Sequence, residues 1–170
     1  MPTPKIVALS MIAAGLLACS TPPDPGAPRP GAVEAPLLRA QWWRTEFYGY
    51  DTASYRLRES GNPEETDELL VDIHYGGSAA DFRDIEWPGS GPRPVRIYQY
   101  SADRCQVFGG LQSRCVYHEV LGIGLPRELL ERSRKTGLVL VLRAKSGADH
   151  DLAMPSEYLD VYLNSIRKAR

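Results

Sequence analysis

The chain has little net charge and no long hydrophobic run. Its 170 residues carry 20 lysines and arginines against 21 aspartates and glutamates, with the two signs interspersed. A nearly neutral chain of this kind has no basic surface for nucleic acid, so we expect no nucleic-acid partner. The longest apolar stretch, residues 6–17, is shorter than the roughly 20 residues that a membrane-spanning helix requires.

Motifs for common catalytic chemistry are absent as well. The chain has neither a His-Glu-x-x-His zinc motif nor a Gly-x-Ser-x-Gly nucleophile motif. Several acidic residues lie close together at 64–68, but they fall in an expected loop and read as a solvated surface. The sequence therefore predicts no catalytic residue, no metal and no cofactor, and it favours a protein that is not an enzyme.

The few histidines do not form an obvious set. They are His74, His118 and His150. His118 and Glu119 are neighbours on an expected strand, where successive side chains point to opposite faces, so they should not act on one substrate. His150 lies between Asp149 and Asp151 in an expected turn, where we interpret all three as solvated. His74 is expected either to point outward from its strand or to pack as a single imidazole.

Residues 1–18 have the layout of an export signal. Lys5 is the only charged residue in this segment, an apolar run follows at 6–17, and the small residue Ala18 ends it. An ordinary secretory signal, cleaved at Ala18 or Ser20, is one interpretation of this layout.

The end of the segment is more specific. The residues Leu16-Leu17-Ala18-Cys19 resemble the lipobox of bacterial lipoprotein precursors, with leucine at −3, a small residue at −1 and then the cysteine. The resemblance implies a signal peptide over 1–18 and attachment of diacylglycerol and an acyl chain such as palmitate to Cys19. Ser20 follows where many lipoproteins retained in the inner membrane carry aspartate. The resemblance thus favours an outer-membrane anchor facing the periplasm over inner-membrane retention.

The lipobox also accounts for the odd number of cysteines. Of the three, lipid on Cys19 would leave Cys105 and Cys115. In an oxidising periplasm, two such cysteines are expected to form a disulfide. They flank Gly109-Gly110 between two expected β segments, so the bond would close a hairpin. A loop of this length would stabilise the fold by roughly 2–3 kcal/mol on the chain-entropy model.

Proline dominates the segment after the cysteine. Residues 20–36 read STPPDPGAPRPGAVEAP, a composition that forms an extended, semi-rigid spacer rather than a core. We expect residues 19–36 to be the lipidated cysteine and a tether. Residues 37–170 should then form a single globular domain in the periplasm.

Short periodic segments in this domain predict an α+β fold. Alternating residues predict strands, at 53–58, 69–75 and 95–100. The continuous apolar run Leu138–Leu142 predicts a strand that is covered on both faces. Helices are expected between Pro126 and Gly137 and from Pro155 or Ser156 onward. Together these features predict an antiparallel sheet or small sandwich of about seven short strands, with two helices packed on it.

The most aromatic stretch, residues 41–50, has two interpretations. Tryptophan, tyrosine and arginine dominate interface hot spots, so Trp42, Trp43, Arg44 and Tyr48 are candidate contacts for a partner. Alternatively, these rings fill the core next to the tether. The pattern decides neither this question nor whether the stretch is helix or strand.

The sequence favours a membrane-anchored envelope lipoprotein that serves as a non-catalytic binding or assembly module. Its partner would be an envelope protein or the cell wall. One alternative is a periplasmic carrier of a small apolar or lipid ligand, and a second is a hydrolase without a recognisable motif. An enclosed apolar pocket would favour the carrier. An exposed aromatic patch would favour the assembly module. A buried His–carboxylate pair in a cleft would favour the hydrolase.

Overall fold

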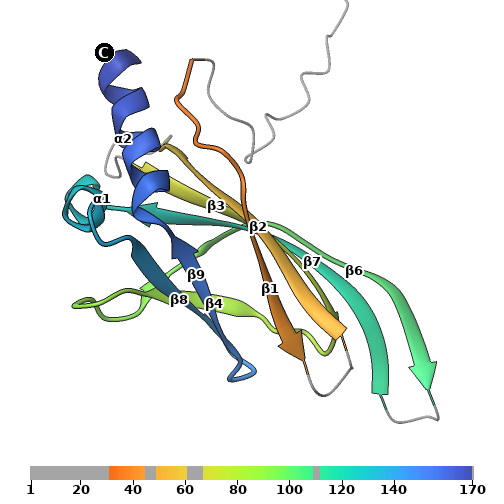
Figure 1. Cartoon of the computed structure of the whole chain (residues 1–170). Coiled ribbons are helices and arrows are strands. Elements are labelled where there is room, and N and C mark those ends of the chain that lie inside the picture. Colours follow the sequence, from red (N-terminus) through yellow and green to blue (C-terminus); the bar gives the residue numbers. More distant parts are fainter. Residues whose placement is uncertain (1–30, 45–48, 61–66, 109–111, 170) are drawn as a thin grey trace, which may run out of the picture.

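The computed structural model describes residues 31–44, 49–60, 67–108 and 112–169. In these residues, nine strands form two antiparallel sheets, and two helices lie at one end of them (Figure 1). The expected α+β fold is confirmed. Two of the strands come from segments without a clear alternating pattern, namely the aromatic stretch and the very short Arg93–Pro94.

The larger sheet has five strands. Their order across the sheet is β1 (Leu38–Arg44), β2 (Gly49–Glu59), β3 (Asp67–Gly77), β7 (Gln112–Leu125) and β6 (Arg96–Phe108). Neighbouring strands are antiparallel, and β3 at the centre pairs with β2 on one side and β7 on the other. The segment expected at 95–100 and the β segment expected before Gly109-Gly110 are one continuous strand, β6.

The smaller sheet has four strands. Their order is β5 (Arg93–Pro94), β4 (Phe82–Glu86), β8 (Leu138–Ala144) and β9 (Asp149–Met154). The expectation that Leu138–Leu142 is covered on both faces is wrong, because Leu140 is fully buried while Val139 is 46% exposed. Only one face of this sheet packs on the core, so the apolar side chains on the other face meet solvent.

The core lies between one face of the five-stranded sheet, which we call the inner face, and the smaller sheet together with the helices. Alternate residues of β3 such as Leu69, Val71 and Ile73 are fully buried on the inner face. Hydrogen bonds join the layers: the Tyr55 hydroxyl donates to the Ala153 carbonyl at 2.8 Å, and the Leu57 backbone N–H donates to the Tyr158 hydroxyl oxygen at 2.8 Å. The opposite, outer face of the five-stranded sheet carries the intervening side chains.

Both helices are found where the sequence predicts them. Helix α1 (Arg127–Ser133) follows Pro126 and buries Leu129 and Leu130. Helix α2 (Ser156–Ala169) has Glu157 in its first turn and Arg167 and Lys168 in its last, which suits the helix dipole. Its apolar residues line one face, as predicted: Tyr158, Leu159, Tyr162, Leu163 and Ile166 are buried.

A buried ionic network ties the start of β3 to both helices. The Asp67 side chain is fully buried and accepts hydrogen bonds from the guanidinium of Arg127, one of them at 2.7 Å from Nη2. It also accepts a 2.6 Å hydrogen bond from the hydroxyl of Tyr162. Burial, together with this bond to Asp67, raises the pKa of Tyr162, so the phenol keeps its proton and donates it.

The chain joins the sheet earlier than the expected domain start at residue 37. The backbone N–H of Ala35 donates to the Leu57 carbonyl at 2.8 Å, and that of Glu59 donates to the Val33 carbonyl at 3.1 Å. Residues 33–35 thus extend the pairing of β2 beyond β1. The proline-rich composition of 20–36 did not indicate this, but residues 33–35 contain no proline, so their backbone N–H groups can pair.

The expected cysteine pair is confirmed: the sulfur atoms of Cys105 and Cys115 lie 2.04 Å apart, at disulfide distance. Cys115 is opposite Gly77, the last residue of β3. Beyond this point β6 and β7 continue as a two-stranded arm that projects away from the helices (Figure 1). A two-stranded hairpin is marginally stable by itself, so a disulfide at its base supports the arm.

Candidate functional site

The outer face of the five-stranded sheet brings three ionisable side chains together. Val71 and Ile73 of β3 point into the core. Because successive side chains of a strand alternate between its faces, Asp72 and His74 point outward. On the neighbouring strand β7, His118 lies directly opposite His74 in the register. The outward orientation predicted for His74 is confirmed, since its side chain is 54% exposed.

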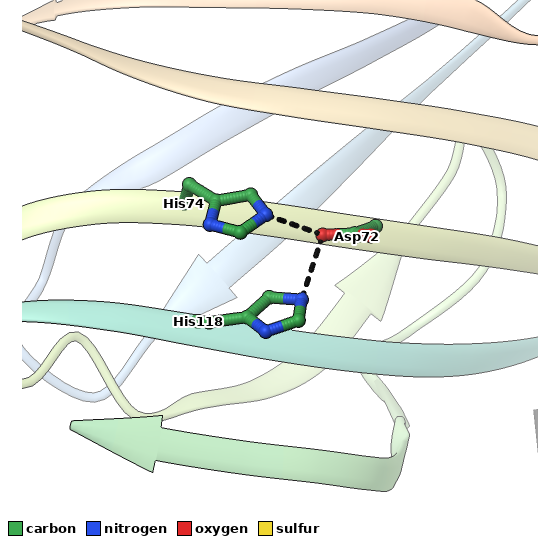
Figure 2. A group of neighbouring side chains, drawn as sticks. All are labelled: Asp72, His74 and His118. Atoms are coloured by element: carbon green, nitrogen blue, oxygen red, sulfur yellow. Dashed lines mark hydrogen bonds and ion pairs between the residues drawn. The ribbon is translucent and has the colours of Figure 1, made fainter. Parts of the chain in front are cut away.

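The two imidazoles share one carboxylate oxygen (Figure 2). Nε2 of His74 lies 3.1 Å from Oδ1 of Asp72, and Nε2 of His118 lies 3.0 Å from the same atom. The rings are stacked, with centroids 4.2 Å apart and planes 8° from parallel. Nδ1 of His118 is in turn 3.3 Å from Nε2 of Gln99 on β6. We call Asp72, His74 and His118 the Asp–His–His cluster.

An open depression of about 270 Å³ lies beside the cluster on the outer face. Its lining includes Asp72 and His74 and continues over β2 and β1. The other lining residues are Arg39, Ala40, Gln41, Thr52, Ala53 and Ser54. Six of the eight lining residues carry a polar or ionisable side chain, so a bound group would find hydrogen-bond partners here.

The histidines form no obvious set in the sequence, but the structure brings His74 and His118 together. The Asp-x-His spacing of residues 72 and 74 places both side chains on one face of a strand, which the sequence alone indicates. The third member comes from a strand that pairs with β3 across more than 40 residues of sequence, and no local pattern indicates that pairing. This long-range pairing is why sequence analysis missed the cluster.

The same strand β7 places Glu119 on the inner face, so His118 and Glu119 point to opposite sides as predicted. Glu119 is fully buried and accepts a hydrogen bond from the hydroxyl of Tyr75. The Tyr75 oxygen itself accepts a 3.0 Å hydrogen bond from the backbone N–H of Ala80. Burial raises the pKa of the Glu119 carboxyl, against the opposing effect of the bond from Tyr75.

This raised pKa predicts a pH-dependent stability. Because the folded state holds the Glu119 proton more tightly than the unfolded state, its contribution is greatest below the ordinary pKa of 4.5 and is lost as the pH rises through the folded value. We expect Glu119→Gln, which keeps the shape but cannot ionise, to gain stability relative to the wild type as the pH rises from about 4.5 to about 7. Urea unfolding of both proteins across this range measures the difference, and parallel pH profiles would contradict the prediction.

His150 is buried rather than solvated, and it lies in β9 rather than in a turn. Its Nε2 is 3.6 Å from Oδ2 of the buried Asp51. Its ring stacks on Trp42 at a centroid distance of 4.3 Å and lies 5.6 Å from the ring of Phe82. This is a buried His–carboxylate pair, but two aromatic rings enclose the imidazole, so it has the character of a core residue. Asp149 and Asp151 on either side are exposed, as expected.

The first residues of the aromatic stretch, 41–44, belong to the edge strand β1, and its last two, 49 and 50, begin β2. Trp42 packs partly buried against the core, and its Nε1–H donates to the Asp151 carbonyl at 3.2 Å. For Trp42 the structure thus fits the core interpretation of this stretch. The side chains of Trp43 and Arg44 and the whole of Tyr48 lie outside the described residues, so their proposed contact role stays a prediction.

Comparison of the chain with protein-family models, curated proteins and solved structures finds no match. Within the described part of the chain, neither helix is long and apolar enough to cross a membrane.

Proposed function

We propose that the chain is a lipid-anchored lipoprotein of the bacterial envelope, with a domain that binds an envelope partner without catalysing a reaction. The observation that carries the proposal is the sequence Leu16-Leu17-Ala18-Cys19 followed directly by a proline-rich segment. A lipid on Cys19 would hold the domain at the membrane, and the following segment would space it from the lipid surface. Ser20 favours the outer membrane, on the periplasmic side.

The cysteine pair supports export. Cys105 and Cys115 lie at disulfide distance, and structural disulfides persist in oxidising compartments such as the periplasm. After lipidation of Cys19, no cysteine of this chain would be left as a free thiol. The cysteine content therefore agrees with the proposed location.

The described surface favours binding over the two alternatives. The depression beside the Asp–His–His cluster is open to solvent and lined mainly by residues with polar side chains, whereas a carrier of an apolar ligand requires an enclosed apolar cavity. The buried pair of His150 and Asp51 is covered by Trp42, whereas a hydrolase requires such a pair to reach a substrate. An open polar face suits contact with a hydrophilic partner, such as an envelope protein or the cell wall.

The anchor is tested by replacing the cysteine. In cells grown with labelled palmitate, the wild type should incorporate the label and sediment with the membranes. Cys19→Ala should incorporate none and lose membrane association almost completely, because no acyl chain remains to hold it. Fractionation of inner and outer membranes then tests the destination. Compared with the wild type, a larger share of the Ser20→Asp variant should be found in the inner membrane.

Cys115→Ala is the matched control, since it removes a cysteine without touching the lipobox and should still be labelled. If Cys19→Ala stays labelled and membrane-bound, the anchor proposal is wrong. If the wild type is secreted without label, residues 1–18 are an ordinary secretory signal and the protein has no lipid anchor.

A further inference from the structure

We propose that the Asp–His–His cluster is a binding site for a divalent transition-metal ion of the kind that prefers imidazole nitrogen, such as Zn²⁺ or Cu²⁺. The ligands would be Nε2 of His74, Nε2 of His118 and a carboxylate oxygen of Asp72. Two imidazoles and one carboxylate are a ligand set that Zn²⁺ and Cu²⁺ accept, whereas Mg²⁺ and Ca²⁺ prefer oxygen ligands alone.

Two of the three separations between the ligand atoms are close to those in a metal site. Ligands at about 2.0–2.1 Å from a tetrahedral zinc ion are separated from each other by about 3.3 Å. The two Nε2 atoms lie 3.1 and 3.0 Å from Oδ1 of Asp72, and the ligand atoms of all three residues lie within 4.8 Å of one another. Small side-chain rotations would therefore bring them around one ion. The dashed lines in Figure 2 mark the contacts of Asp72 with His74 and with His118, and coordination of the ion would take the place of these two contacts.

The backbone holds the cluster in place before any ion binds. His74 and His118 are directly opposite each other on two hydrogen-bonded strands at the centre of the sheet, and Asp72 is two residues from His74 on the same strand. The ligands are thus positioned by the sheet rather than by a loop, so little chain ordering opposes binding.

Gln99 can orient one ligand. A metal on Nε2 of His118 requires the proton to sit on Nδ1, and Nδ1 lies 3.3 Å from the side-chain amide of Gln99. A half-turn of that amide would place its oxygen as the acceptor for the Nδ1 proton, and oxygen and nitrogen of an amide are interchangeable in shape. Such an outer partner fixes the imidazole tautomer in many metal sites.

The site is also reachable and incompletely enclosed. The side chains of His118, Asp72 and His74 are 23%, 41% and 54% exposed, so an ion can enter from solvent. Three protein ligands leave at least one coordination position for water or for a group of a bound partner. The neighbouring depression contains Arg39, which suits a partner group with negative charge.

Isothermal titration calorimetry tests the site, with ZnCl₂ added to the full chain in detergent and a non-coordinating buffer. We expect one ion per chain in the wild type. His74→Ala and His118→Ala should each weaken binding at least tenfold, and the double variant should lose it. Asp72→Asn, which keeps the size of the side chain, should also weaken binding. Zn²⁺ should raise the melting temperature of the wild type but not that of the double variant.

Gln41→Ala is the matched control, because Gln41 lines the same face without being a ligand, and its affinity should equal that of the wild type. Circular dichroism confirms that each variant is folded, and an alanine variant that is not folded is replaced by the asparagine variant at the same position, His74→Asn or His118→Asn. No bound zinc in the wild type, or equal binding in the double variant, would overturn the proposal. Because the readout is metal binding by the domain, the result is independent of whether Cys19 carries lipid.

Discussion

Asp67→Ala is expected to lower the free energy of unfolding by about 3–5 kcal/mol, the range typical of breaking a buried ion pair. The carboxylate of Asp67 is fully buried and receives hydrogen bonds from Arg127 of α1 and Tyr162 of α2. Removing it leaves a guanidinium and a phenol without their shared acceptor at the point where β3 begins. Urea unfolding followed by far-UV circular dichroism measures the loss.

The matched control is Asp160→Ala, because Asp160 also joins the two helices. It pairs with Arg134 at the surface, where water and salt screen the attraction, so the control should unfold nearly as the wild type does. If Asp67→Ala and Asp160→Ala have similar midpoints, the network around Asp67 does not hold the helices to the sheet.

Trp42→Ala is expected to cost about 2–3 kcal/mol, less than a fully buried tryptophan because the ring is only partly covered. The variant would lose the stack on His150 and the hydrogen bond from Nε1 to the Asp151 carbonyl. Both contacts connect the edge of the larger sheet to β9 of the smaller one. Thermal or urea unfolding measures the effect.

Tyr50→Ala provides the comparison, since Tyr50 lies on the adjacent strand β2 with 59% of its surface exposed and should cost less than about 1 kcal/mol. An unchanged stability of Trp42→Ala would assign the ring to a contact surface instead. Trp42 would then return to the set of candidate partner contacts with Trp43, Arg44 and Tyr48.

Features that depend on local periodicity could be predicted from the sequence. The alternation in 53–58 and 69–75 gave the strands β2 and β3, and the apolar stripe after Pro155 gave α2 with its buried face. The continuous apolar run of β8 was misleading, because a run of this kind also occurs on a strand with one solvent-facing side. One outward valine costs little, because the surface of a folded protein is normally more than half apolar.

Features that depend on long-range pairing could not be predicted. The Asp-x-His spacing at residues 72 and 74 was visible, but His118 joins them only because β7 pairs with β3. The burial of His150 could not be predicted either, because its neighbours Asp149 and Asp151 suggested a solvated turn. It is buried because β9 brings it against Trp42 from the other sheet.

The central position of β3 also limits the order in which the chain can fold. Its partner on one side, β2, is close in sequence, but on the other side Gly77 pairs with Cys115, so this ladder closes a loop of 37 residues, 78–114. Contacts of such separation slow folding, because the entropy of the loop is lost before the contacts form. The β6–β7 hairpin, by contrast, is local and can form early, with Cys105 and Cys115 side by side. We therefore expect the rate-limiting step to be the docking of a preformed hairpin onto the open edge of β3.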